Sequence, residues 1–315
     1  MKTLAELAEE VQDVVRPFGH AETLLFYGLV APKLKKFLAG KEIAAKNWLP
    51  SGPMPYLIKR GSKEEPLGAE EMAREITPEF LEIRRTTEHL ADAKSKLTRA
   101  QQKIWNYFLP RKLADFFYAT NGEGEGKPIE RIFFDLDRGE RITSEQARAV
   151  ADAFVEVIDD DVEFKVQLGK ILESEKLVAW TGSSFHVFLF FKKPQPAQIY
   201  EKYFQYTKKD PGASFTGRWA AQVAKKVGFK VVGGHEKKPD EINIDPSQTP
   251  SGKLCRAPLG SLHMADARTV DGVSLPLERK MLGERGLVEE LHAYTPKKLI
   301  EEIDSLAKRL PEKFR

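Results

Sequence analysis

The chain has 315 residues, of which 41% are hydrophobic, enough for one large domain or two smaller ones. Its 50 basic and 47 acidic residues nearly cancel, so the global charge points to no partner and only local charge clusters are informative. A single cysteine, Cys255, excludes an intramolecular disulfide framework and any zinc site built from several cysteines, so no structural zinc is expected.

No segment predicts secretion or a membrane span. The N-terminal stretch MKTLAELAEEVQDVV is acidic and amphipathic, and it lacks the basic start and apolar run of a signal peptide. No apolar stretch approaches the roughly 18 residues that a transmembrane helix needs. These features predict a soluble, cytoplasmic protein with no membrane partner.

Residues 1–110 are predicted to be mainly helical. Leu4, Leu7 and Val11 recur at a helical spacing, and a loop rich in proline and glycine follows at 49–53. A second helical stretch is predicted over 78–108.

The end of this helical region carries a basic run, with no acid between residues 94 and 112. Aromatic residues at 105, 107 and 108 are interleaved with it. Positive charge combined with aromatic rings is typical of surfaces that bind single-stranded nucleic acid. An ordinary solvated helix face explains the run equally well. The candidate nucleic-acid contacts here are Lys94, Arg99, Lys103 and Arg111.

From residue 111 strands alternate with helices, which predicts a mixed α/β (α+β) core. Strands are expected at 114–119, 131–137, 162–166, 229–232 and 241–245, with two more in 177–191 around a turn at 181–183. Helices are expected at 145–158, behind a cap at 143–146, and at 196–208, 215–228 and 284–309. The expected regions are therefore a helical 1–110, a core at 111–275 and a helical segment at 276–315.

The first polar cluster lies in RIFFDLDRG, residues 131–139, where an apolar strand ends in Asp135 and Asp137. Side chains two positions apart on a strand share a face, so both carboxylates can reach one cation. Hard divalent ions such as Mg²⁺ prefer oxygen ligands. Alone, such a pair at a strand end is more typical of a turn or a cap.

The second cluster is Ser184 with His186, which follow Gly182 and lead into an apolar strand. A hydroxyl and an imidazolium on one face suit a phosphate, and the glycine permits close approach of the backbone. The alternative is a histidine satisfied inside the sheet. A serine nucleophile is disfavoured, because the surrounding residues do not form a Gly-x-Ser-x-Gly elbow.

The third cluster is Asp245, again at the end of an alternating strand and followed by a proline. Alone it would indicate a turn. Shortly after it, the segment 254–263 brings Arg256, Ser261 and His263 around a Pro-Leu-Gly turn. Because a guanidinium can bind phosphate oxygens in pairs, this segment is a candidate anion site. In this order, the three clusters fit a site for two-metal nucleotidyl transfer.

These motifs resemble the archaeo-eukaryotic primase superfamily, in particular the primase-polymerases of archaeal plasmids. The resemblance covers about 111–265 and consists of an hhhDhD strand, a Ser-x-His strand, a third acidic strand and an Arg-Leu-Pro-Gly-Ser-Leu-His loop. The matching residues are Ile132–Asp137, Ser184–His186, Ile244-Asp245 and Arg256–His263, the last with one inserted residue between proline and glycine.

The resemblance implies a primase-polymerase catalytic core at 111–275 with an RRM-like sheet. Asp135, Asp137 and Asp245 would bind two Mg²⁺ or Mn²⁺ ions, which activate the attacking hydroxyl and hold the triphosphate. The substrates would be dNTPs, NTPs or both. The phosphate contacts would be Ser184, His186, Arg256, Ser261 and His263.

The implied template is single-stranded or primed DNA. Besides the run at 94–112, a second candidate surface is 202–230, whose seven basic residues face a single acid, Asp210. Lys208, Lys209 and Arg218 are its candidate contacts, and Tyr203 and Trp219 could stack bases. Ordinary solvated lysines are again the alternative. The resemblance also implies that the protein acts in plasmid or viral-type replication. Its expected partners there are a helicase or further domains of a longer polypeptide.

Other functions remain open from the sequence. A repair or end-joining polymerase of the same superfamily would use the same chemistry. A catalytically inactive nucleic-acid-binding replication protein is a different class, although all three expected carboxylates are present. A metal-dependent nuclease also uses clustered acids, but it would leave the segment 256–263 unexplained.

Overall fold

The computed structural model describes residues 2–9, 20–48, 55–58, 66–108, 113–119, 121, 126–264 and 270–311. Val11 and the loop expected at 49–53 lie outside these residues. The chain divides into two compact units. Unit 1 comprises residues 1–118, 256–275 and 293–315, and unit 2 comprises 119–255 and 276–292.

Unit 1 is organised around the helix α2 (His20–Leu34), against which α3, α4, α12 and α13 pack. The region before residue 110 is not only helical, because β1 pairs antiparallel with β2 and with β3. The helix expected at 78–108 is divided, since Thr98 begins a new helix with a capping box closed by Gln101.

The helices of unit 1 are α1 (Leu4–Glu9), α2, α3 (Ala69–Glu75), α4 (Pro78–Thr86), α5 (Leu90–Ala93), α6 (Arg99–Tyr107), α12 (Pro296–Glu301) and α13 (Ile303–Ala307), with the 3-10 helix η1 (Lys94–Lys96). Its strands are β1 (Ile43–Trp48), β2 (Pro55–Ile58), β10 (Leu262–Met264) and β11 (Val270–Val273). Two further strands, β3 (Leu113–Ala119) and β9 (Leu254–Arg256), span the sequence boundaries between the units. In the described part of the chain, no helix is long and apolar enough to cross a membrane.

Unit 2 has the predicted mixed α/β architecture, with a six-stranded sheet of order β12-β5-β6-β4-β8-β7. The β5–β6, β6–β4 and β4–β8 pairs are antiparallel, and β7 runs parallel to β8. The strands are β4 (Ile129–Arg138), β5 (Leu172–Trp180), β6 (Phe185–Gln195), β7 (Val231–Gly233), β8 (Ile242–Asp245) and β12 (Leu275–Leu277). The helices are α7 (Ser144–Asp160), α8 (Val162–Leu168), α9 (Gln198–Tyr203), α10 (Phe215–Val227) and α11 (Leu287–His292), with η2 (Pro211–Ala213) and η3 (Arg279–Gly283).

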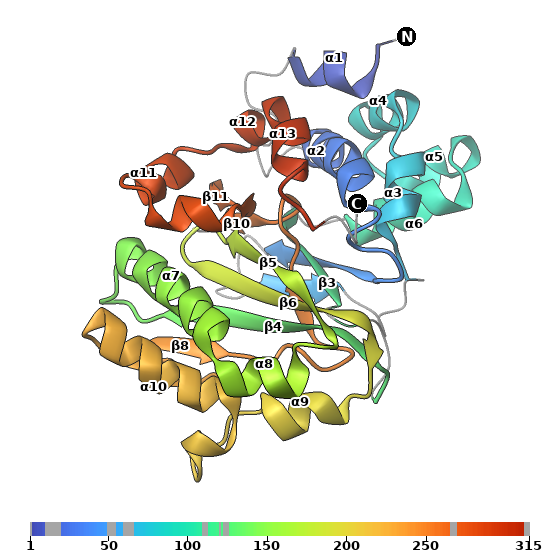
Figure 1. The fold of residues 1–315 in the computed structure, drawn as a ribbon. Helices are drawn as coiled ribbons and strands as arrows, with labels where there is room; N and C mark the ends of the chain where they lie inside the picture. Colours follow the sequence, from blue (N-terminus) through green and yellow to red (C-terminus); the bar gives the residue numbers. More distant parts are fainter. Residues whose placement is uncertain are drawn as a thin grey trace. The chain divides into compact units, whose positions relative to one another are not determined.

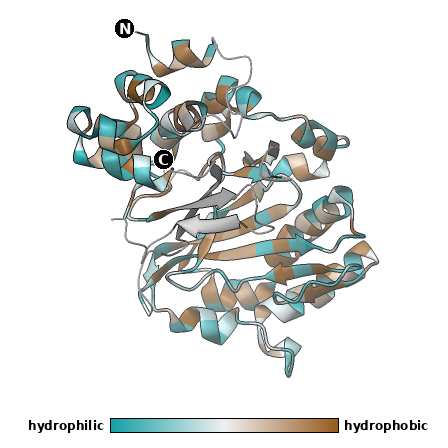
Figure 2. Ribbon diagram, turned by 180° about the vertical axis from the view of Figure 1, so that it is seen from behind, coloured by the Kyte–Doolittle hydropathy of each residue, from teal (hydrophilic) through white to brown (hydrophobic). Residues whose placement is uncertain are grey.

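Helices α7 and α10 cover one face of this sheet (Figure 1). Phe134 of β4 packs on that face against Phe154 of α7 and Trp219 of α10, with ring centroids 5.1 and 6.0 Å apart. The strands of the sheet are coloured mainly as hydrophobic in Figure 2, as expected of a buried layer. Because side chains alternate along a strand, Phe133, Asp135 and Asp137 point to the opposite face.

The strand predicted at 162–166 is wrong, because this segment forms the helix α8. The alternation in Val-Glu-Phe-Lys-Val imitates a strand, but Phe164 and Leu168 are the residues that it buries, four positions apart. Val162 and Val166 remain exposed. The side chain of Asp161 accepts a hydrogen bond from the backbone N of Phe164 at 2.9 Å and so caps the helix.

Other predicted boundaries are confirmed. Thr143 and Gln146 form the expected capping box at the start of α7. The helix α10 ends at Gly228, whose φ of 76° lies in the left-handed region that glycine adopts without strain. The boundaries expected for the helix at 196–208 are wrong, because α9 ends at Tyr203.

Two side chains replace a neighbouring strand along the first half of β4, since the β8 register begins only at Asp135. Asn121 accepts from the backbone N of Arg131 at 3.0 Å and donates to the carbonyl O of Arg131 at 2.9 Å. Thr249 accepts from the backbone N of Phe133 at 3.0 Å and donates to its carbonyl O at 3.1 Å. These bonds satisfy buried backbone groups and hold β4 extended as it approaches its carboxylates.

We predict that Thr249→Val destabilises the protein by about 1–3 kcal/mol, because the isosteric change leaves the backbone N–H and C=O of Phe133 without these partners. Urea denaturation measures the loss as a lower midpoint. Thr207→Val, at an exposed threonine of the same unit, is the matched control and should change the midpoint little. Equal midpoints for the two variants would contradict a structural role for Thr249.

Candidate active site

Three of the predicted site residues form one row across three adjacent strands of unit 2. Asp135 of β4 lies directly opposite His186 of β6 on one side and Asp245 of β8 on the other. Asp137 follows two residues along β4, opposite Asn243 of β8. Directly opposed residues of antiparallel strands share a face. All five side chains therefore belong to the face that α7 and α10 do not cover.

His186 is buried and directed toward the carboxylates. Its Nε2 lies 3.4 Å from Oδ1 of Asp135, and its ring packs edge-on against Phe133 at 4.7 Å between centroids. Nδ1 of His186 is buried and has no hydrogen-bond partner within the described residues. A histidine whose only role was structural would be expected to use both ring nitrogens, since unpaired buried polar atoms are costly.

The pKa of Asp137 responds to the charges of its neighbours. The nearby Asp135 carboxylate, followed by burial, raises the pKa of Asp137, although Lys237 and His186 oppose that rise. Nζ of Lys237 lies 3.6 Å from Oδ1 of Asp137. Such crowding of like charges is relieved when a cation binds between them.

Asp245 is held by the residue two positions after it. Its Oδ1 accepts from the backbone N of Ser247, and its Oδ2 from the Ser247 hydroxyl, each at 2.9 Å. Burial is the largest cause that raises the pKa of Asp245, and Asp135 adds to it, whereas the Ser247 bonds and His235 lower it. Ser247 therefore orients the carboxylate while leaving each oxygen a further lone pair.

The carboxylates are neighbours, but they do not yet converge. Among the described residues, no three His, Cys, Asp or Glu side chains form a ready-made metal cluster. The Ser247 bonds account for this in part, because they turn both oxygens of Asp245 toward that residue. The donor chemistry nevertheless fits a hard divalent cation, because each of the three acids supplies oxygen ligands and the pKa of Asp137 is raised mainly by the negative charge of Asp135.

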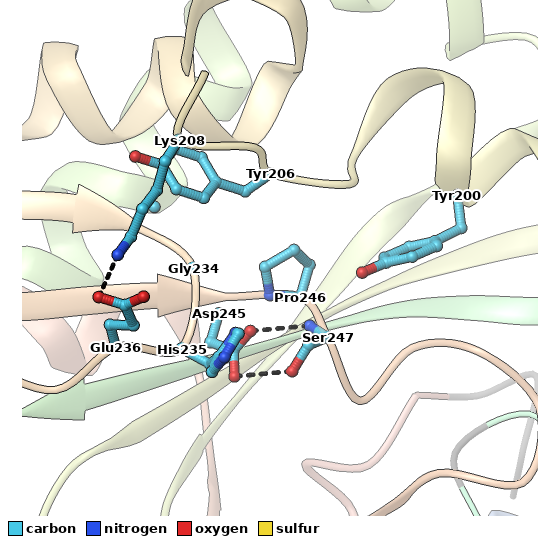
Figure 3. Close-up of a pocket in the computed structure, with 10 residues that line it drawn as sticks. Tyr200, Tyr206, Lys208, Gly234, His235, Glu236, Asp245, Pro246 and Ser247 are labelled. Carbon is cyan, nitrogen blue, oxygen red and sulfur yellow. Dashed lines mark hydrogen bonds and ion pairs between the residues drawn. The ribbon is translucent and has the colours of Figure 1, made fainter. Parts of the chain in front are cut away.

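A cavity of about 320 Å³ opens beside Asp245 (Figure 3). It lies at the carboxyl ends of the parallel strands β7 and β8, where open α/β sheets commonly bind ligands. The residues that line it are Tyr200, Tyr206, Lys208, Gly233, Gly234, His235, Glu236, Asp245, Pro246 and Ser247. Burial and the negative charge of Asp245 raise the pKa of Tyr200, so its phenol remains neutral.

Ser184 lies beside the row, in the turn between β5 and β6. Its hydroxyl donates to the carbonyl O of Leu136, and its backbone N donates to the Thr181 hydroxyl at 3.1 Å. Arg138 fixes the same turn, because its Nε donates to the carbonyl O of Ser183 at 2.9 Å. In this structure the Ser184 proton is therefore used to join the turn to β4, and its predicted phosphate contact stays a prediction.

Arg256, Ser261 and His263 belong to unit 1, whereas the row belongs to unit 2. The turn between Arg256 and Ser261 is tight, since the backbone N of Ser261 donates to the carbonyl O of Ala257 at 3.1 Å. Leu259 has a φ of 64°, in the left-handed region that a leucine rarely adopts. It is the residue by which segment 256–263 departs from the superfamily loop that it resembles.

The aromatic residues in the first basic run are not available to bases. Trp105, Tyr107 and Phe108 are all buried, so these rings do not contribute to a binding surface in this run, and its backbone contacts stay a prediction. Lys103 donates to the carbonyl O of Pro66 at 2.7 Å and lies 2.5 Å from Glu71. Lys94 and Arg99 are exposed, and Arg111 lies outside the described residues.

The second basic stretch is largely neutralised by acids from elsewhere in the chain. Lys208 pairs with Glu236, Arg218 with Glu163, Lys226 with Glu156 and Lys230 with Glu241. Lys209 is exposed. Trp219 is fully buried and donates to Asp161 at 2.8 Å, so the prediction that it stacks bases is wrong. Tyr203 packs against Phe215, with 6.0 Å between ring centroids.

Sequence reasoning missed four residues of this site, namely Asn243, His235, Lys237 and Ser247. The period-two pattern that places Asp245 on the sheet face also places Asn243 there, so that signal was present. Ser247 follows the Asp-x-Ser spacing of a side chain that caps its own turn. His235 and Lys237 lie in HEKKPD, which resembles any charged loop.

No family model matches the chain, and no curated protein sequence matches it. The fold is similar to that of the polymerase domain from Mycobacterium tuberculosis ligase D, solved in complex with DNA. The TM-score is 0.54, the sequence identity 17%, and 93% of each chain is covered. At this identity the similarity establishes the fold alone.

Proposed function

We propose that this protein is a metal-dependent nucleotidyltransferase, a primase-polymerase that makes and extends primers on a single-stranded DNA template. The observation that carries the proposal is the row His186–Asp135–Asp245 with Asp137 beside it. The fold similarity to a DNA-bound polymerase domain supports the same reading. A plasmid or viral-type replication setting, with a helicase or further domains as partners, belongs to this proposal.

In this mechanism, Asp135, Asp137 and Asp245 would hold Mg²⁺ or Mn²⁺. Bound divalent ions stabilise the charge on the attacking and leaving oxygens of an in-line displacement. The primer 3′-oxygen attacks the α-phosphorus of a dNTP or NTP, a new P–O bond forms, the bond to pyrophosphate breaks, and the hydroxyl proton passes to water. The protein's contribution is preorganisation, because the strand register fixes the acids before the substrate arrives.

His186 and Ser247 position this site. His186 lies against Asp135 from β6, and its imidazole is the proposed contact of a substrate phosphate. Ser247 orients Asp245 from the next strand. Arg256, Ser261 and His263 remain proposed phosphate contacts, and Lys94, Arg99, Lys103, Arg111, Lys208, Lys209 and Arg218 remain proposed template contacts.

A repair or end-joining polymerase is the second candidate function. The observation that favours it is that the similar solved polymerase domain comes from a protein named a ligase. The two candidate enzymes differ in the nucleic-acid substrate that they need to begin synthesis. A primase-polymerase yields labelled products from an unprimed single-stranded template, whereas a repair polymerase extends only pre-existing 3′ ends.

We predict that Asp135→Ala combined with Asp137→Ala abolishes nucleotide incorporation while DNA binding stays within about twofold, because the variant loses metal ligands and no template contact. Primer extension with labelled dNTPs and Mn²⁺ measures nucleotide incorporation. Fluorescence anisotropy of labelled DNA measures DNA binding. Glu175→Ala, at an exposed acid of the same sheet, is the control. Primer extension by the double variant would overturn the metal assignment.

We also predict that Asp137→Asn raises the melting temperature of the metal-free protein and abolishes further stabilisation by Mn²⁺. The pKa of Asp137 is raised in the folded state, so its contribution to stability is present at low pH and is lost as the pH rises through that folded pKa. Above that folded pKa the carboxylate of Asp137 destabilises the fold, and the amide removes this effect.

The measurement for Asp137→Asn is thermal unfolding at pH 7 with and without Mn²⁺. The wild-type protein should gain stability, by about 2.7 kcal/mol where Mn²⁺ is a hundredfold above its Kd. Glu175→Gln should behave as wild type. A variant that still gains full stability from Mn²⁺ would show that Asp137 is not a ligand.

A further inference from the structure

The segment between β7 and β8, residues 234–241, is bonded at several points to β8 and to the residues that follow β4, and we call it the 234–241 strap. The backbone N of Gly234 donates to the carbonyl O of Ile244 at 3.0 Å, and that of Gly139 to the carbonyl O of Glu241 at 2.9 Å. The backbone N of Arg141 donates to the carbonyl O of Pro239 at 2.8 Å. The strap is therefore fixed at both ends, through Gly234 and Glu241, and near its C-terminal end through Pro239.

Gly139 makes this approach possible. A Cβ atom at this position would lie 2.1 Å from the carbonyl O of Lys238 and 2.4 Å from that of Pro239. Both distances are far below any real contact, and the obstructing atoms are backbone, so they cannot rotate away. The glycine that follows Asp-Leu-Asp-Arg is thus required for the strap to lie against the end of β4.

The strap directs two basic side chains at two of the acids. Lys237 lies 3.6 Å from Asp137, and His235 lies close enough to Asp245 to lower its pKa (Figure 3). Both basic side chains are exposed, as the substrate face of a site requires. An exposed pair at 3.6 Å stabilises a fold by about 1 kcal/mol or less, so Lys237 can leave Asp137 for a stronger partner.

A buried polar atom beside Asp137 also indicates a ligand. Asn243 is buried opposite Asp137, and its Nδ2 donates to the carbonyl O of Glu236 at 2.9 Å. Its Oδ1 is buried without a hydrogen-bond partner in the described part of the chain. A buried acceptor left unpaired is costly, which indicates that a cation or donor reaches this position in the working state.

We propose that the 234–241 strap binds the triphosphate: Lys237, with His235, holds the β- and γ-phosphates of the incoming nucleotide, whose tail enters the cavity beside Asp245. This inference rests on the proposed nucleotidyl transfer and names residues for it. When the acids bind metal, Lys237 is released from Asp137 and moves to the phosphate oxygens. The lysine therefore neutralises Asp137 in the empty site and the substrate in the occupied one.

The test is nucleotide binding without primer or template, so that no reaction occurs. The titrated ligand is a fluorescent mant-dATP in the presence of Mn²⁺, and pyrophosphate is titrated as a competitor. Lys237→Ala should raise the Kd for mant-dATP by about tenfold, the loss expected for one hydrogen bond to a charged group. Lys237→Arg should recover most of the affinity. DNA affinity should not change for either variant.

Lys238→Ala is the matched control, because it removes the neighbouring exposed lysine of the same strap. Its Kd should stay within about twofold of wild type. Gly139→Ala provides an independent arm, since it displaces the strap while keeping every charge. It should weaken mant-dATP binding although circular dichroism shows a folded protein.

The outcomes separate this inference from the proposed function. If the wild type binds mant-dATP and incorporates nucleotides, while Lys237→Ala binds as tightly as wild type, the strap assignment is wrong and nucleotidyl transfer stands. Equal losses in Lys237→Ala and Lys238→Ala would also overturn it, because the effect would be one of general charge. If the wild type binds no nucleotide with Mn²⁺, both proposals fall.

Discussion

The structure of the site depends on the register of β4 between β6 and β8. In that register, Asp135 is the common neighbour of His186 and Asp245, so residues distant in sequence become adjacent side chains. A shift of one residue in either pairing would turn a carboxylate to the face covered by α7 and α10. Several features of unit 2 preserve the register, including the Asn121 and Thr249 bonds to β4 and the Ser184 bond to Leu136.

Concentrating acids on one face of a sheet destabilises the unliganded protein. The raised pKa values of Asp137 and Asp245 express this, since crowding and burial both disfavour the ionised forms. Basic groups offset part of the charge, with His186 beside Asp135, Lys237 beside Asp137 and His235 near Asp245. We propose that these groups bind anions once cations occupy the acids. In the proposed mechanism, the same residues thus serve both the empty and the loaded site.

Much of the site could be predicted from sequence because its signals are local. The alternation in Arg131–Gly139 and in Ile242–Asp245 placed the acids on strand faces, and the structure forms strands there. Whether Asp135 lies opposite Asp245 is a matter of register between strands distant in sequence, and no local pattern determines it. The superfamily resemblance implied only that the three acids share a metal site.

Other features depend on tertiary contacts that leave no pattern in the chain. Val162–Leu168 alternates like a strand but is helical, because Phe164 and Leu168 bury on one helix face and Asp161 caps the first turn. Trp219 lies in a stretch of sequence whose basic and aromatic residues are typical of a base-stacking surface. In the structure its side chain is buried inside an aromatic cluster. Lys237 follows no motif, and its position depends on Gly139, almost a hundred residues earlier.

The most direct measurement is anomalous diffraction from crystals that contain Mn²⁺ and a non-hydrolysable nucleoside triphosphate. The metal assignment predicts manganese peaks at ligand distance from the carboxylate oxygens of Asp135, Asp137 and Asp245, with the Asp245 carboxylate still oriented by Ser247. Nucleotide bound with no manganese on this face of the sheet would contradict it.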